Sequence, residues 1–184
     1  MVYPAHHRRI VEDLMGGKFI LSNEDHYNSL KENEKFYQEF FKLSFDLDMA
    51  MKPEFCYLIS KDTQENFSRD VCIFVAVLCY ELDKDGQNFM EMLDYHEFNF
   101  EEVDRFFENS SFIDLIESNK AIKDQDGRRT LINGMARRNI VHKSFEDRFI
   151  FTQAHRVFID FAKELAMRKM AVSPNENNAT VSQS

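Results

Sequence analysis

The strongest constraint on the fold lies in residues 120–151, where a basic amphipathic segment leads directly into a hairpin pattern. Apolar residues recur at helical spacing on one side of the first part: Leu131, Ile132, Met135 and Ala136. At about 100° per residue, polar side chains face the other way: Arg129, Asn133 and Arg137. Apolar residues at 140–141 and 149–151 then flank a polar turn, which predicts two antiparallel strands. A helix followed at once by a hairpin is typical of the end of a winged helix.

The same segment carries much of the basic charge. It holds eight of the 23 Lys and Arg residues but only four of the 32 Asp and Glu residues, in a chain of net charge −9. Because the whole chain repels phosphate, any DNA contact must be local or assisted by a partner. The candidate phosphate contacts are Arg129, Asn133 and Arg137 on the helix and Lys143 on the wing. The alternatives are a solvated helix face and a docking face for an acidic partner. Arg128 falls toward the apolar side and is assigned to the helix start.

The first 60 residues show the same order of elements. A helix runs to about Met15, where two glycines end it, and a short strand is predicted at 18–21. Two more helices follow, the first started by Ser22 with Asp25 and the second capped by Asn33.

Period-two alternation at 45–51 and 55–59, around a turn at 52–54, predicts a second hairpin. The helix before it presents a mixed to acidic face, which favours contact with protein over DNA: Glu34, Lys35, Gln38, Glu39 and Lys42. Both halves of the chain therefore predict a winged helix.

Residues 62–82 give the strongest helical pattern, and their apolar surface is wide enough for burial on more than one side. This helix is either a spine between two domains or a dimer contact. Further helix starts are predicted at Asn99, with Glu102, and at Ser111, with Asp114.

The predicted fold is mainly α with short β-hairpins, an α+β architecture of tandem winged-helix domains with a long connecting helix. The N-terminal winged helix is assigned to residues 1–62, the connecting helix to 63–86 and the C-terminal winged helix to 87–170. Residues 171–184 are polar and aperiodic, which predicts a disordered tail.

The sequence contains no motif of a phosphate-binding loop, dinucleotide site, nucleophile elbow or zinc protease, so no enzyme activity, cofactor or metal is predicted. Three cysteines without a paired motif indicate reduced, buried thiols: Cys56, Cys72 and Cys79. No apolar run approaches the roughly 20 residues of a membrane span, and no signal peptide is evident. We therefore expect a cytoplasmic protein without membrane contact.

Residues 14–21, 27–37, 40–41 and 55–58 together resemble the bacterial condensin accessory subunits MukE and MksE. These are the tandem winged-helix KITE subunits that bind the kleisin of an SMC complex. The specific likeness covers roughly the first third of the chain, and the second half matches only in architecture.

The resemblance implies a non-enzymatic homodimer that binds a MukF- or MksF-like kleisin and, through it, a MukB- or MksB-like SMC ATPase. Such a complex organises chromosomes on the nucleoid or restricts plasmids. The family's contact with DNA in the assembled complex would correspond here to Arg129, Arg137, Arg138 and Lys143, beside Asn133.

A second hypothesis is a free-standing winged-helix transcription regulator. A regulator should bind a defined duplex alone with salt-dependent affinity. A condensin subunit should bind duplex weakly alone and capture a kleisin.

Overall fold

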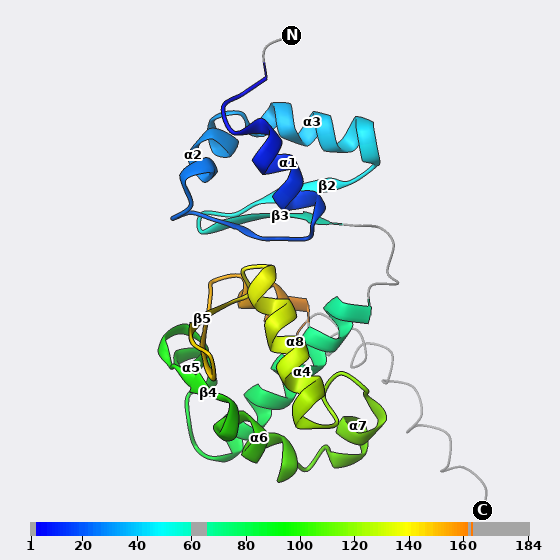
Figure 1. Ribbon diagram of the computed structural model, residues 1–184, viewed down its shortest axis with the longest axis vertical. Coiled ribbons are helices and arrows are strands. Elements are labelled where there is room, and N and C mark those ends of the chain that lie inside the picture. The colour runs from blue at the N-terminus through cyan, green and yellow to red at the C-terminus, as the bar shows by residue number, and fades with distance from the viewer. Residues whose placement is uncertain (1–2, 60–65, 162, 164–184) are drawn as a thin grey trace, which may run out of the picture.

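The computed structural model describes residues 3–59, 66–161 and 163, arranged as two units stacked along the long axis of the molecule (Figure 1). The predicted tail, residues 171–184, lies outside the described residues. Among the described helices, none is long and apolar enough to cross a membrane.

The N-terminal unit places three helices over one face of a small antiparallel sheet (Figure 1). Its elements are α1 (His7–Met15), β1 (Ile20–Leu21), α2 (Asp25–Glu32), α3 (Glu34–Phe45), β2 (Asp48–Met51) and β3 (Phe55–Ile59). The strand order is β1-β3-β2, and the hairpin register pairs Asp48 with Ile59 and Met51 with Cys56. The predicted order of helices and hairpin is therefore confirmed.

The interior of this unit is largely aromatic and aliphatic. Its buried side chains are Ile10, Leu14, Ile20, Tyr27, Leu30, Tyr37, Phe41, Met49 and Cys56. They come from all three helices and all three strands, so every element of the unit contributes side chains to one apolar core.

Local start signals in this unit were predicted less well than the elements. Asn33 is the N-cap residue of α3 as predicted, but neither α2 nor α3 has a side-chain capping hydrogen bond, so the predicted capping by Ser22 and by the Asn33 side chain is wrong. Glu24 precedes α2 and accepts a hydrogen bond from the Leu21 amide at 2.8 Å instead. The Asn33 side chain donates backward to the Ser29 carbonyl at 2.8 Å.

Phe45 also departs from the predicted strand at 45–51, because it forms the last residue of α3. Its ring packs edge-on against Phe40, with ring centroids 5.9 Å apart, and Asp46 then ends the helix with a φ of 52°. The aromatic contact outweighs the alternating pattern, which local sequence alone could not reveal.

The C-terminal unit combines a second small three-stranded sheet with a larger set of helices. Its elements are α4 (Asn66–Lys84), α5 (Phe89–Tyr95), β4 (Phe98–Asn99), α6 (Phe100–Glu108), α7 (Ile113–Ser118), α8 (Gln125–Arg137), β5 (Val141–Phe145) and β6 (Arg148–Phe151). Residues 155–161 are helical again. The strand order β4-β6-β5 matches that of the first sheet, and the predicted second hairpin is confirmed.

Side-chain caps in this unit follow the sequence in part. The Asn99 side chain accepts from the Glu102 amide at 2.8 Å, which confirms that start signal. Ser111 does not cap α7; the hydroxyl of Ser110 accepts from the Phe112 amide instead. Strand β4 was not predicted, since two residues are too short to show alternation.

Helix α4 is buried on several sides, as its wide apolar surface predicted. It contacts α5, α6 and α8 of the same chain, and its buried residues include Val71, Phe74, Leu78 and Leu82. Cys72 and Cys79 pack at the edge of this core, where burial raises the pKa of Cys72 to about 11 and that of Cys79 to about 12. These thiols are therefore protonated at neutral pH and pack as apolar groups.

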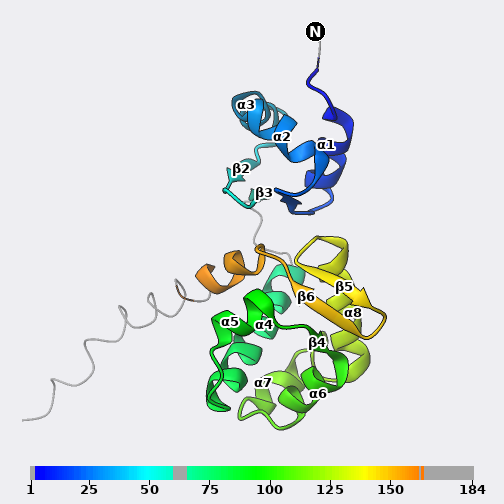
Figure 2. The same cartoon turned by 90° about the vertical axis from the view of Figure 1, so that its left-hand side faces the viewer.

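The two units meet at Phe19. Its amide donates to the Arg138 carbonyl at 3.0 Å, and its own carbonyl accepts from the Asn139 side chain at 2.8 Å. Its ring stacks on Tyr57 at 5.1 Å and approaches Phe158 at 6.2 Å. Residues 155–161, orange in Figure 2, lie between the units at this junction.

Helices combined with two antiparallel three-stranded sheets confirm the α+β class. The tandem winged-helix description and the domain boundaries stay predictions. Phe19 and Phe55 of the first unit belong to the same buried cluster as α4 and the C-terminal sheet. The apolar interior is therefore continuous across the junction.

Gly127, in the first turn of α8, allows a close approach of the preceding loop. A β-carbon there would lie 2.9 Å from the Lys120 carbonyl oxygen and 3.0 Å from that of Ala121. We expect Gly127→Ala to lower the free energy of unfolding by about 1–2 kcal/mol, because the clash with rigid backbone exceeds the gain in helix propensity.

Chemical denaturation measures this effect. Thr130→Ala, at an exposed position of the same helix, is the control and should change stability by less than about 0.5 kcal/mol. A Gly127→Ala variant as stable as the parent would contradict the close-packing argument.

Candidate functional site

Helix α8 has the amphipathic character that its sequence predicted. Leu131, Ile132 and Met135 are buried, whereas Arg129, Asn133 and Arg137 are exposed. The Asp124 side chain accepts from the Gly127 amide at 2.8 Å and caps the helix. The helix is therefore anchored at its start and presents one polar face to solvent.

Arg128 fixes the rotation of this helix. Its side chain is only 2% exposed, and Nε lies 2.6 Å from Oδ1 of Asp104 on α6. Nη1 also donates to the Ile122 carbonyl at 3.0 Å, and the guanidinium lies over the Phe107 ring. The prediction that Arg128 belongs with the helix rather than the phosphate-contacting face agrees with this burial.

Two of the predicted site residues lie over one aromatic ring, and a third is hydrogen-bonded to one of them. Lys143 Nζ, on β5, donates to Asn133 Oδ1 at 3.1 Å and lies 5.5 Å from the centre of the Phe100 ring. The Arg129 guanidinium lies 5.7 Å from the same centre. We call Phe100, Arg129, Asn133 and Lys143 the Phe100 cluster. Cation–π contacts hold both cationic groups in place without neutralising them.

Phe100 itself was missed from the sequence. It follows the Asn99 cap as the first residue of α6, a position that carries no signal for a binding role. Its partners come from 29 and 43 residues downstream in the chain, so only the folded structure brings them together.

The remaining two predicted residues differ in environment. Arg137 is exposed on the last turn of α8. Arg138 is partly buried: its guanidinium lies 4.0 Å from the centre of the Phe67 ring on α4, and Nη1 donates to the Gly134 carbonyl at 3.4 Å. Its backbone carbonyl also receives the Phe19 amide, so Arg138 lies at the junction rather than in the Phe100 cluster.

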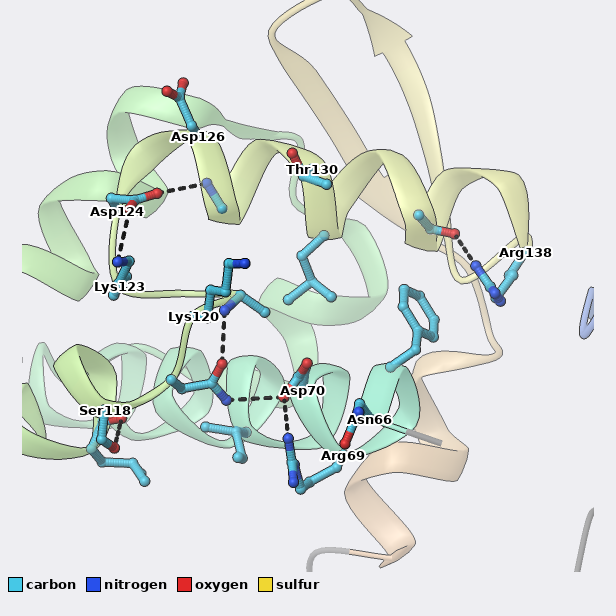
Figure 3. A pocket seen from close by; sticks show the side chains of 18 of the residues that line it. Asn66, Arg69, Asp70, Ser118, Lys120, Lys123, Asp124, Asp126, Thr130 and Arg138 are labelled. Carbon is cyan, nitrogen blue, oxygen red and sulfur yellow. Dashed lines mark hydrogen bonds and ion pairs between the residues drawn. The ribbon is translucent and has the colours of Figure 1, made fainter. Parts of the chain in front are cut away.

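An open groove of about 1110 Å³ runs between α4 and α8 (Figure 3). Its apolar lining comes from Phe67, Ile73, Leu115 and Leu131, and its polar lining includes Arg69, Asp70, Lys120, Lys123, Asp126 and Arg137. Asn119 ties the loop before α8 to α4 by donating to Asp70 Oδ1 at 3.0 Å. Sequence reasoning missed this groove because the residues of its two walls lie far apart in the chain, at 66–73 and 115–138.

The N-terminal unit also brings potential metal-ligand side chains together. Among the described residues, one group lies close enough to share an ion: Asp13, Glu24 and His26 of the N-terminal unit. This group is remote in sequence from the Phe100 cluster.

Removing the Arg128 guanidinium should leave the buried Asp104 carboxylate without its ion-pair partner. We expect Arg128→Met to lower the free energy of unfolding by about 3–5 kcal/mol, measured by chemical denaturation. Arg129→Met, at the exposed neighbouring position, is the control and should cost less than about 0.5 kcal/mol.

The double variant Arg128→Met with Asp104→Leu separates the ion pair from packing. It should be more stable than Arg128→Met alone, since no unpaired charge remains buried. A single variant close to wild-type stability would refute the anchoring role of Arg128.

Comparison with known proteins identifies the family of the chain. The family model described as condensin complex protein MksE matches residues 5–163, which is most of the sequence. The comparison with curated proteins gives no match. The match spans both units, and the chain therefore belongs to the MksE family of condensin complex proteins.

Proposed function

We propose that this protein is a non-enzymatic accessory subunit that binds the kleisin of an SMC condensin-like complex and helps that complex engage DNA. Membership of the MksE family supports a role within a condensin complex. The observation that carries the DNA part of the proposal is the exposed basic face formed by α8 and β5.

The proposal treats both units as winged helices. Each unit contains a helix, a short strand, further helices and a closing hairpin, and each sheet has the order first, third, second. By position, α3 and α8 are the helices immediately before the hairpins. In a winged helix this helix and the hairpin reach nucleic acid or protein together.

The Phe100 cluster supports phosphate contact by the second unit. Arg129 and Lys143 extend from helix and wing over one ring, and Arg137 continues the exposed row on α8. The Lys143–Asn133 hydrogen bond joins helix to wing, so the donors are preorganised. Arg138 would act by positioning α8 against α4, because its guanidinium faces Phe67.

The charge of the chain argues for assisted DNA binding. With a net charge of −9, the free subunit repels a duplex at long range. A kleisin and an SMC ATPase that hold the basic face against DNA would overcome this repulsion. A free-standing regulator would have to bind without that help, and family membership does not favour it.

We further propose that the groove between α4 and α8 receives a segment of the kleisin. The groove is lined by apolar side chains and by charged side chains of both signs. Such a lining suits a peptide that buries a few apolar side chains and forms hydrogen bonds along its backbone. A homodimeric state, a nucleoid location and a role in either chromosome organisation or plasmid defence belong to the same proposal.

Charge reversal tests the DNA face. Arg129→Glu with Arg137→Glu should weaken duplex binding by the assembled complex at least about tenfold and flatten its salt dependence, since phosphate contacts are lost. Fluorescence anisotropy of a labelled duplex at several salt concentrations measures both effects.

The matched control is Arg8→Glu with Arg9→Glu, which makes the same charge change on exposed arginines of α1. It should affect duplex binding less than the α8 pair. Equal losses in the two double variants would mean that only net charge matters, and no loss would remove the α8 face from DNA contact.

The kleisin groove has its own test. Leu115, exposed beside α4, can be changed to glutamate with little cost to the core, and Leu115→Glu should weaken kleisin capture at least about tenfold. Tyr95→Glu, on α5 outside the groove, is the control for adding a charge at an exposed apolar site. Unchanged capture by Leu115→Glu in quantitative co-purification would exclude the groove.

A further inference from the structure

The turn that joins α1 to α2 gathers three potential metal ligands. Asp13 lies in the last turns of α1, Glu24 immediately precedes α2, and His26 lies in its first turn. One ligand atom from each of the three lies within 4.8 Å of the others. Gly17, with a φ of 72°, reverses the chain and brings these segments together.

His26 is the unusual member of this group. Its side chain is 0% exposed, yet neither ring nitrogen has a hydrogen-bond partner among the described residues. Nε2 points into the group and approaches Asp13 Oδ2 at 3.1 Å without hydrogen-bond geometry. A fully buried imidazole with neither nitrogen hydrogen-bonded is rare in folded proteins and calls for an additional ligand.

The charges around His26 favour a cation at this point. Two carboxylates, those of Asp13 and Glu24, each place an oxygen within 4.8 Å of a His26 ring nitrogen. The Lys18 ammonium already bonds to Glu24 Oε1 at 2.9 Å and to Asp13 Oδ2 at 3.3 Å. Neither of these two hydrogen bonds reaches His26, so the lysine neutralises the carboxylates but leaves both ring nitrogens without a hydrogen bond.

We propose that Asp13, Glu24 and His26 bind a divalent transition-metal ion, with Zn²⁺ the best match, in exchange for the Lys18 ammonium. An imidazole with two carboxylates is a zinc-type ligand set, whereas Mg²⁺ and Ca²⁺ prefer oxygen alone. In a tetrahedral site, zinc–ligand lengths of about 2.0–2.2 Å imply ligand-to-ligand edges of about 3.3–3.6 Å. The Asp13–His26 edge of 3.1 Å is already close to that value.

The position of Glu24 connects this site to the junction between the units. Its Oε2 accepts from the Leu21 amide at 2.8 Å and from the Asn139 side chain at 3.0 Å. An ion held by Oε1 would leave both bonds intact and restrict the Glu24 side chain. Metal binding should therefore stabilise the contact between α2 and the end of α8.

Calorimetric titration of the metal-stripped full chain with ZnCl₂ tests the site. We expect one Zn²⁺ per chain in the wild type, binding at least about 30-fold weaker in His26→Gln, and binding several-fold tighter in Lys18→Met, where the competing ammonium is gone. Co²⁺ substitution provides a second readout, because the absorption spectrum reports nitrogen and oxygen ligation directly.

His96→Gln is the matched control, since His96 also lies 3.1 Å from a carboxylate, that of Glu102, but in no three-ligand group of the described residues. It should bind Zn²⁺ as the wild type does. If His26→Gln does not fold, Asp13→Asn tests the same site with the same expected loss. Undiminished binding in the His26 or Asp13 variant, or no binding by Lys18→Met, would overturn the proposal.

Discussion

The arrangement of the two units depends on a short stretch of backbone around Phe19. Its amide and carbonyl pair with residues 138 and 139, which follow α8, and its ring enters the buried cluster of the C-terminal unit. Asn139 adopts a left-handed φ of 59°, which turns its side chain toward both Phe19 and Glu24. The end of α8 is therefore both the close of the basic helix and the attachment point of the N-terminal unit. A rearrangement between the units would have to break these hydrogen bonds.

A second constraint gives α8 its orientation. Arg128 and Arg129 are adjacent and chemically identical, yet one is buried against Asp104 and the other lies over Phe100 in an exposed position. The buried pair costs desolvation energy, and its gain is a defined rotation of the helix. That rotation directs Arg129, Asn133 and Arg137 away from the core. The proposed DNA contact therefore depends on the Arg128–Asp104 ion pair, which is itself buried and would not touch DNA.

The proposed role agrees with the distribution of charge and apolar surface. A basic face limited to one helix and one wing, in a chain of net charge −9, is suited to work beside other subunits rather than alone. The groove between α4 and α8 adjoins this face through Arg137, so a bound kleisin segment would lie next to the proposed DNA contact. The zinc-type group lies in the other unit, on the Glu24 side of the Phe19 junction.

Local periodicity was sufficient to predict most helices, both hairpins and the amphipathic face of α8, but not the two-residue strand β4 or the helical end at Phe45. The sequence also carried the family resemblance that the comparison confirmed. The cap at Asn99 was predicted correctly. At Asn33 the position was correct, but its side chain bonds backward to Ser29, and near Ser111 it is Ser110 that accepts the backbone amide. Three arrangements became apparent only in the folded chain: Arg129 and Lys143 over Phe100, Arg138 over Phe67, and the group of Asp13, Glu24 and His26. These contacts join side chains from separate elements, and their formation depends on packing geometry that no local pattern encodes.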